Sequence, residues 1–412
     1  MIPYCTFTLA NGLRVVHHYD PSAPLVTVNL LYNVGSRDEN PERTGLAHLF
    51  EHLMFGGSAN VPDFDGTLEM AGGTNNAWTS NDFTNFYDEV PPVNLSTALR
   101  AEADRMEQLL LTDRSLDVQR KVVIEEFRQV CLNKPYGDFG HKLRPVVYRV
   151  HPYRIPTIGL KPEHIAEASA DEIRSFYRSH YAPNNAVLAI AGPVTLERTR
   201  EEVERWFGPL ERREIAPRTY AQEPPVEEAR REIVVEPVPQ TIISICFPMS
   251  AYFAPGYREA DLITDVLASG NSSRFYQELV MGTDLFTSAD AAITGSDEPG
   301  FLKVSGSLRG NSDADIERAE AALWSQVERM AIHGPTDYEV ERALNRFESR
   351  YMLSSVSCRN KALALATGTM QGVDVNSQVP VYRQVTAAGI AAEAARILRP
   401  ERSCTLIYRA ES

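Results

Sequence analysis

The segment His48-Leu49-Phe50-Glu51-His52 carries two imidazole side chains four residues apart, with a carboxylate directly before the second one. On an α-helix, residues i and i+4 lie on one face, and residue i+3 lies beside them. At about 100° per residue, the two histidines and Glu51 fall at about 0°, 40° and 300°, whereas the neighbouring apolar side chains fall between about 100° and 240°. The segment therefore predicts a helix that buries one face and presents a polar cluster on the other.

This polar cluster suits a metal. Two histidines so placed can bind one zinc ion, and Glu51 can reach the water that the ion activates. The order H-x-x-E-H is the reverse of the H-E-x-x-H zinc motif. A hydrolytic zinc site needs three protein ligands and one open position. A third ligand, a carboxylate or an imidazole, must therefore come from elsewhere in the chain.

The best candidate for the third ligand is Glu126, in the segment Lys121–Val130. If this segment is helical, Glu126 lies at about 40° from Val122, inside a stripe of apolar side chains, whereas Glu125 lies at about 300°, towards solvent. A carboxylate on a buried face is costly unless it pairs with a cation or binds a metal. The segment alone leaves both alternatives open, but beside the histidine pair it favours metal binding.

Composition narrows the function classes. The 412 residues predict two domains of roughly 200 residues each. A net charge of −14 argues against nucleic acid and anionic membrane surfaces as partners. No apolar run approaches the roughly 20 residues that span a membrane. The five cysteines include no C-x-x-C pair, which argues against a disulfide framework or a cysteine zinc site.

The compartment is less constrained. The chain shows no charged segment followed by an apolar one at its start, but a signal peptide already removed would leave the same appearance. We expect a location in the bacterial periplasm, with the cytoplasm as the alternative.

The chain contains a repeat and a boundary. Prolines and charged residues concentrate between about residues 209 and 231, which is typical of an exposed linker. We therefore expect a zinc-binding domain at 1–213, a linker at 214–231 and a homologous domain without metal at 232–412. When Ala47–Met54 is aligned with Ala260–Leu267, the apolar positions coincide. Two aspartates and a threonine then replace the histidines and the glutamate of the motif.

Five segments together resemble the pitrilysin and mitochondrial processing peptidase family of zinc peptidases, in its half-length bacterial form. They are HLFEH (48–52), LEMAGGTNNAWTSNDFTNFY (68–87), RKVVIEEF (120–127), HPYRIPTIG (151–159) and HYAPNNAVLAIAGPV (180–194). The resemblance covers nearly the entire chain. It implies an α+β fold of two similar domains, each a mainly antiparallel or mixed β-sheet with helices packed on one face. Two such chains would face each other as the halves of a clamshell.

The resemblance also implies roles for particular residues. His48, His52 and the distal Glu126 would hold one zinc ion, with Glu51 as general base. Asn76 and Ala77 match the family's substrate-binding edge strand, which pairs with an extended peptide as an added β-strand. Relatives often carry an acidic residue seven positions before the zinc glutamate. This chain has Gln119 there, which could orient a ligand or a water from the second shell of the site.

A larger departure concerns the second domain, where the family usually carries an arginine and, seven residues later, a tyrosine. Here these positions are Val280 and Thr287. In relatives these two groups contact the substrate and the developing oxyanion, and such donors contribute a few kcal/mol each. We therefore expect a zinc metalloendopeptidase for peptides or unfolded segments that acts with a homologous, zinc-free partner subunit carrying both residues. A homodimer is the runner-up, and a non-catalytic structural or binding subunit is the alternative function.

Overall fold

A computed structural model of the chain describes residues 1–411. The fold consists of two compact units, and each is discontinuous in sequence. Unit 1 comprises Met1–Arg128, Ile155–Tyr220 and Tyr351–Gln378. Unit 2 comprises Gln129–Arg154, Ala221–Arg350 and the residues from Val379 onward. The units thus exchange one segment each, whereas the ranges 1–213, 214–231 and 232–412 are a proposed division along the chain.

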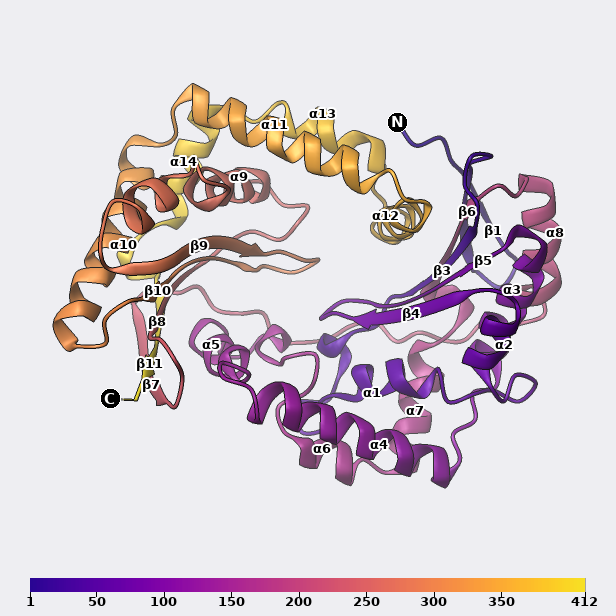
Figure 1. Cartoon of the computed structure of the whole chain (residues 1–412). Coiled ribbons are helices and arrows are strands. Elements are labelled where there is room, and N and C mark those ends of the chain that lie inside the picture. Colours follow the sequence, from indigo (N-terminus) through magenta and orange to yellow (C-terminus); the bar gives the residue numbers. More distant parts are fainter. Residues whose placement is uncertain (412) are drawn as a thin grey trace. The chain divides into compact units, whose positions relative to one another are not determined.

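Unit 1 is built on a six-stranded sheet in the order β1-β2-β6-β3-β5-β4 (Figure 1). Only the pair β2 and β6 is parallel. Every residue of β3 and β6 is buried, as expected for strands covered on both faces. The strands are β1 (Cys5–Thr8), β2 (Arg14–Tyr19), β3 (Val26–Tyr32), β4 (Thr74–Thr79), β5 (Thr84–Val90) and β6 (Ala186–Gly192).

Most helices of unit 1 share one hydrophobic core with one face of this sheet. They are α1 (Leu46–Leu53), α2 (Phe64–Met70), α3 (Leu95–Glu107), α4 (Asp113–Phe127), α6 (Pro162–Glu167), α7 (Ala170–His180) and α8 (Leu196–Phe207). A single helix, α12 (Cys358–Gln371), packs on the other face (Figure 1). No local pattern in the sequence predicts α12 there, although the apolar residues on both faces of β3 and β6 require a cover on each side.

Unit 2 has a five-stranded sheet in the order β7-β11-β8-β10-β9, in which only β7 and β11 are parallel. One face packs on α9, α10, α11 and α14, and the other on α5. The strands are β7 (Arg230–Glu236), β8 (Ile242–Pro248), β9 (Phe286–Thr294), β10 (Phe301–Leu308) and β11 (Cys404–Ala410). The helices are α5 (Phe139–Val147), α9 (Tyr257–Ala268), α10 (Asp313–His333), α11 (Asp337–Ser354), α13 (Gln378–Tyr382) and α14 (Ala387–Ile397).

The two sheets confirm the predicted repeat. The strand order β2-β6-β3-β5-β4 of unit 1 matches β7-β11-β8-β10-β9 of unit 2, and the first two strands are parallel in each. Helix α9 corresponds to α1, but the polar side chains that replace the histidines bind other residues of unit 2. The Tyr382 hydroxyl donates to Asp261, and Asp265 forms an ion pair with Arg350 at 2.7 Å. The expected fold class of two homologous α+β domains is therefore confirmed.

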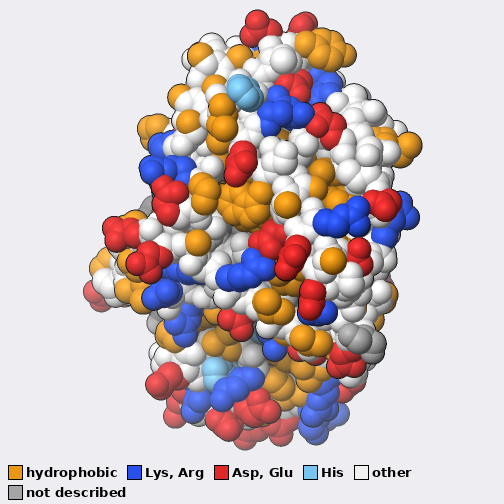
Figure 2. All heavy atoms as spheres, turned by 90° about the vertical axis from the view of Figure 1, so that its left-hand side faces the viewer, with side chains coloured by type: hydrophobic (Ala, Val, Ile, Leu, Met, Phe, Trp, Pro, Cys, Tyr) orange, Lys and Arg blue, Asp and Glu red, His pale blue; other side chains and the backbone are white. Residues whose placement is uncertain are grey.

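Two surface properties follow from the described residues. Across 1–411, no helix combines the length and the apolar character that a membrane crossing requires. On the face drawn in Figure 2, acidic and basic side chains are interspersed, so the negative net charge is not gathered there into a single acidic patch.

Candidate metal centre

The N-terminus of helix α1 is capped by a residue from outside the helix. Gly45 precedes the helix in the left-handed region, at φ 91°, and a Cβ there would lie 3.0 Å from the carbonyl oxygen of Ile158. Because glycine has no side chain, it cannot cap the helix. The buried Glu39 does so instead, since its two carboxylate oxygens accept from the backbone N–H groups of Gly45 and Ala47 at 2.7 and 2.8 Å.

The apolar face of α1 is buried, and the polar face carries the predicted cluster. Nε2 of His48 and Nε2 of His52 lie 3.3 Å apart. Helix α4 packs against α1 and brings Oε2 of Glu126 to 3.6 Å from the first nitrogen and 3.1 Å from the second. Within residues 1–411, these three form the only group of His, Cys, Asp or Glu side chains that could hold a metal ion.

The three distances match a tetrahedral zinc site. Zinc bonds of about 2.0–2.1 Å separate two ligand atoms in a tetrahedron by about 3.3 Å. The neighbouring Glu125 has a side chain that is 53% exposed and pairs with Arg128, whereas the side chain of Glu126 is 37% exposed. Glu126 is thus the less exposed of the two, but the apolar stripe predicted around it is not buried throughout, since Val122 and Val130 are 44% and 45% exposed.

The charges in this cluster are compatible with metal binding. Burial lowers the pKa of His48 to about 4, which leaves its imidazole neutral near pH 7 and its ring nitrogen available as a ligand. The hydrogen bond with His52 holds the pKa of the Glu126 carboxyl below its usual range. A pair of imidazole nitrogens beside a carboxylate is a donor set that zinc prefers.

Glu51 lies on the same helix face as the two histidines and has a partner that sequence reasoning missed. The Thr79 hydroxyl, at the end of β4, donates to Oε2 of Glu51 at 2.6 Å. Burial raises the pKa of Glu51, and the hydrogen bond from Thr79 opposes this rise. A carboxylate with a raised pKa accepts a proton more readily, as a general base must.

Asn76 and Ala77 lie in β4, which is the edge strand of the unit 1 sheet. Their partners on β5 are Tyr87 and Phe86. The Ala77 N–H is hydrogen-bonded at 2.8 Å to the side-chain oxygen of Asn76, at an exposed position. The other side of β4 therefore offers backbone groups to an added strand, as the sequence analysis expected of a peptide-binding edge.

The remaining predicted positions, Gln119, Val280 and Thr287, form no hydrogen bond with the metal cluster among the described residues. Gln119 is half-buried on α4, and no hydrogen bond joins it to either histidine or to Glu126 within residues 1–411, so its second-shell role stays a prediction. In unit 2, Val280 ends the π-helical turn Phe275–Val280, and Thr287 lies in β9. The Thr287 hydroxyl hydrogen-bonds to the carbonyl oxygen of Ser307 at 3.2 Å.

Glu39 and Thr79 are the two site residues that sequence reasoning missed. A sequence signal for Glu39 does exist: it is an acidic residue shortly before a predicted helix, and the glycine that precedes this helix cannot cap it. No such signal exists for Thr79. The hydrogen-bond partner of a hydroxyl at the end of a strand depends on the folded chain and cannot be predicted from local sequence.

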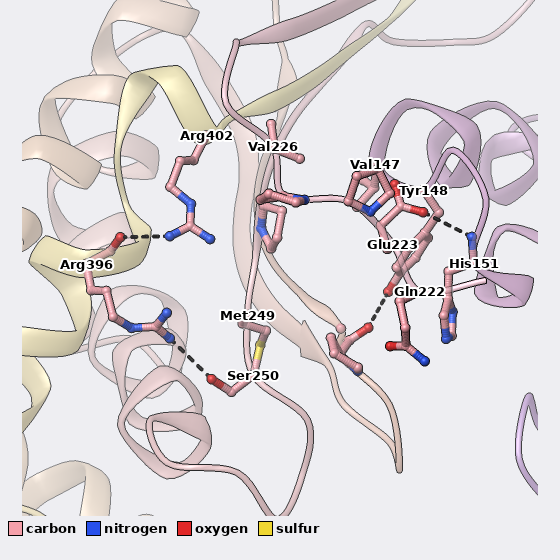
Figure 3. A pocket seen from close by; sticks show the side chains of 15 residues that line it. Val147, Tyr148, His151, Gln222, Glu223, Val226, Met249, Ser250, Arg396 and Arg402 are labelled. Atoms are coloured by element: carbon pink, nitrogen blue, oxygen red, sulfur yellow. Dashed lines mark hydrogen bonds between the residues drawn. The ribbon is translucent and has the colours of Figure 1, made fainter. Parts of the chain in front are cut away.

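A separate cavity of about 220 Å³ lies within unit 2 (Figure 3). Its walls combine apolar side chains such as Val147 and Met249 with the guanidinium groups of Arg396 and Arg402. Several of its polar groups are engaged with the protein. Arg396 pairs with Glu393, and Glu223 accepts from three consecutive backbone N–H groups. Among the described residues, the cavity contains no group of potential metal ligands like the one formed by His48, His52 and Glu126.

A helix bearing H-x-x-E-H, a distal glutamate and an open edge strand are together the features of an inverted-motif metallopeptidase. Comparison with protein families agrees. Residues 14–157 match the family described as Insulinase (Peptidase family M16), and residues 167–347 match the Peptidase M16 inactive domain. The chain belongs to the M16 peptidase family.

Individual relatives support this assignment. The chain is 28% identical over 342 residues to the zinc protease PqqE of Helicobacter pylori, covering 81% of this chain and 76% of that protein. It is 25% identical over 359 residues to the zinc protease YmxG of Bacillus subtilis, which covers 86% and 85% of the two chains.

Solved structures show the same fold. A protease from Helicobacter pylori aligns over the full length of both chains with a TM-score of 0.91 at 24% identity. Pitrilysin aligns over 99% of this chain with a TM-score of 0.80 at 20% identity, but over only 45% of its own length. This chain therefore corresponds to about half of pitrilysin.

Proposed function

We propose that the chain is the zinc-bearing subunit of a metalloendopeptidase that hydrolyses peptides or unfolded polypeptide segments. The observation that carries the proposal is the spacing of 3.1 to 3.6 Å between the ligand atoms of His48, His52 and Glu126. Glu51 lies on the same helix face as these histidines. The family assignment supports the use of zinc.

These three residues would hold one zinc ion per chain. When bound, zinc supplies Lewis-acid activation of a water molecule and of the scissile carbonyl. Glu51 takes the proton of the attacking water and then delivers it to the leaving amine, which is general base and general acid catalysis by one carboxylate. The neutral state of His48 keeps its nitrogen free of a competing proton near pH 7.

The substrate would bind as an added strand on β4, beside Asn76 and Ala77. Main-chain hydrogen bonds of this kind tolerate many side chains, so they favour extended peptides over folded proteins. The Ala77 N–H would exchange its bond with the Asn76 side chain for one with the substrate backbone.

A homologous partner subunit without the zinc motif would complete the active site. Val280 cannot donate a hydrogen bond from its side chain, and the Thr287 hydroxyl is already bonded to Ser307. Neither supplies the arginine and tyrosine contacts that the family resemblance leads us to expect from the second domain. We therefore expect low activity from the chain alone, a heterodimer as the working form and a homodimer as the runner-up. We propose the bacterial periplasm as the compartment, with the cytoplasm as the alternative.

The test is metal analysis together with cleavage of fluorescein-labelled casein, an unfolded protein, with and without the co-purified partner. We expect one zinc per chain and cleavage that depends on the partner. The variant Glu51→Gln should keep its zinc and lose cleavage, and retained turnover would exclude Glu51 as the base. Full zinc occupancy without cleavage under every condition would favour a non-catalytic binding subunit instead.

A further inference from the structure

The strand offered to the substrate and the helix that carries the base are joined by one side-chain hydrogen bond. Ala77 and Thr79 are two residues apart on β4, so their side chains point to the same face of the sheet. Ala77 packs against the core that includes α1. The Thr79 hydroxyl reaches across to α1 and donates to Oε2 of Glu51 at 2.6 Å.

This bond gives a fixed partner to a side chain that packing encloses only in part. Glu51 lies on the polar face of α1, and a glutamate loses considerable rotamer entropy when it is fixed in one position. A base has to lie within hydrogen-bond reach of the proton that it abstracts. A short hydrogen bond from a residue on a paired strand can hold the carboxylate in that position before the substrate arrives.

The location of Thr79 adds a second consequence. Thr79 pairs with Thr84 of β5 at the end of the register in which Ala77 pairs with Phe86. A peptide added to the outer side of β4 would pair with the strand that bears this hydroxyl. The same strand would then hold the substrate on its outer edge and the base through Thr79.

We propose that Thr79 is a positioning residue, which holds the Glu51 carboxylate in its reactive orientation beside the peptide-binding strand β4. The proposal rests on the proposed function, because it assigns Thr79 a role in the reaction that Glu51 would perform. Thr79 acts only through its hydrogen bond to Glu51 and takes no part itself in the proton transfer.

The experiment compares Thr79→Val, which removes the hydroxyl at nearly constant volume, with Thr79→Ser, which keeps it. Thr67→Val on α2 is the matched control, since the Thr67 hydroxyl donates to the backbone carbonyl of Asp63. Each protein is prepared zinc-loaded with the co-purified partner, and kcat and KM for labelled casein are measured. Zinc content and a crystal structure of each variant accompany the kinetics.

We expect Thr79→Val to lower kcat by about tenfold with a much smaller change in KM, as is typical when an orienting partner of a reactive group is lost. Thr79→Ser should recover most of this loss, whereas Thr67→Val should match the wild type. Zinc content should be unchanged in all three variants. In the crystal, the Glu51 carboxylate should leave its single position only in Thr79→Val.

Two results would overturn the proposal: wild-type kcat in Thr79→Val, or a Glu51 carboxylate that keeps its position in that variant. A third result, loss of kcat in Thr79→Ser as well as in Thr79→Val, would also overturn it, because Thr79→Ser keeps the hydroxyl and the loss would then have another cause. If the wild type cleaves nothing, the proposed function fails. The crystallographic comparison then still decides whether Thr79 positions Glu51.

Discussion

The replacement of Glu126 by glutamine tests the metal site most directly, because it needs no knowledge of substrate or partner. The change keeps the shape of the side chain and removes the negative charge that lies 3.1 Å from His52 and 3.6 Å from His48. Two histidines four residues apart would remain as the only strong ligands. A zinc site with two protein ligands lacks the third that hydrolytic sites use.

The expected magnitude follows from the position of Glu126 among the ligand atoms. Loss of a partner that only orients a metal ligand weakens binding by about 10- to 100-fold. Loss of a direct ligand should therefore raise the Kd for zinc by more than about 100-fold, which corresponds to more than about 2.7 kcal/mol. The matched control is Glu125→Gln, one residue earlier on α4, whose carboxylate pairs with Arg128 and faces solvent.

The assay is a competition titration of the metal-free protein against a chromophoric zinc chelator near pH 7. Thermal unfolding of the metal-free variants shows whether each is folded before zinc is added. We expect Glu125→Gln to bind zinc as the wild type does and Glu126→Gln to bind it much more weakly. The reasoning would be refuted if Glu126→Gln kept the wild-type Kd, and a loss confined to Glu125→Gln would assign the ligand to the neighbouring carboxylate.

Three further predictions concern stability. Replacing Glu39 by alanine leaves two buried N–H groups at the start of α1 without their acceptor, so urea unfolding should show a loss of about 2 kcal/mol; an unchanged midpoint would contradict this cap. Removal of zinc by a chelator should lower Tm, and zinc should restore it, because a ligand present at 1,000 times its Kd adds about 4 kcal/mol to the free energy of unfolding; identical Tm values would argue against a specific site. The Lys361 ammonium beside Asp20 holds the pKa of that carboxyl well below its usual range, so this pair contributes stability that is present above about pH 4 and is lost as the pH falls further. Lys361→Met should therefore cost about 1 kcal/mol near pH 7, with a difference from the wild type that shrinks in acid; a difference independent of pH would exclude the ion pair as its source.

Local periodicity made much of this fold predictable. The helical periodicity of His48–His52 predicted helix α1. The same periodicity predicted that Glu125 and Glu126 point in different directions from their helix. The segment Lys121–Val130, which was treated as helical, belongs to α4 as far as Phe127 and then to a π-helical turn over Arg128–Leu132. The repeat could be predicted because α1 and α9 bury apolar side chains at the same positions of the aligned sequences.

Periodicity shows that a helix face or a strand face is buried, but it does not show which element buries it. That α12, from the C-terminal half of the chain, covers the second face of the unit 1 sheet was therefore not readable from the sequence. The contacts of Glu39 with the start of α1, and of Thr79 with Glu51, depend in the same way on packing between segments far apart in the chain.

The sequence by itself determined the chemical groups of the site, because two histidines and a glutamate at this spacing lie on one face wherever the segment is helical. Only the tertiary structure decided that they form a metal-sized cluster. The third ligand is on a different helix, and its distance from His52 is set by the packing of α4 on α1, which no local pattern specifies.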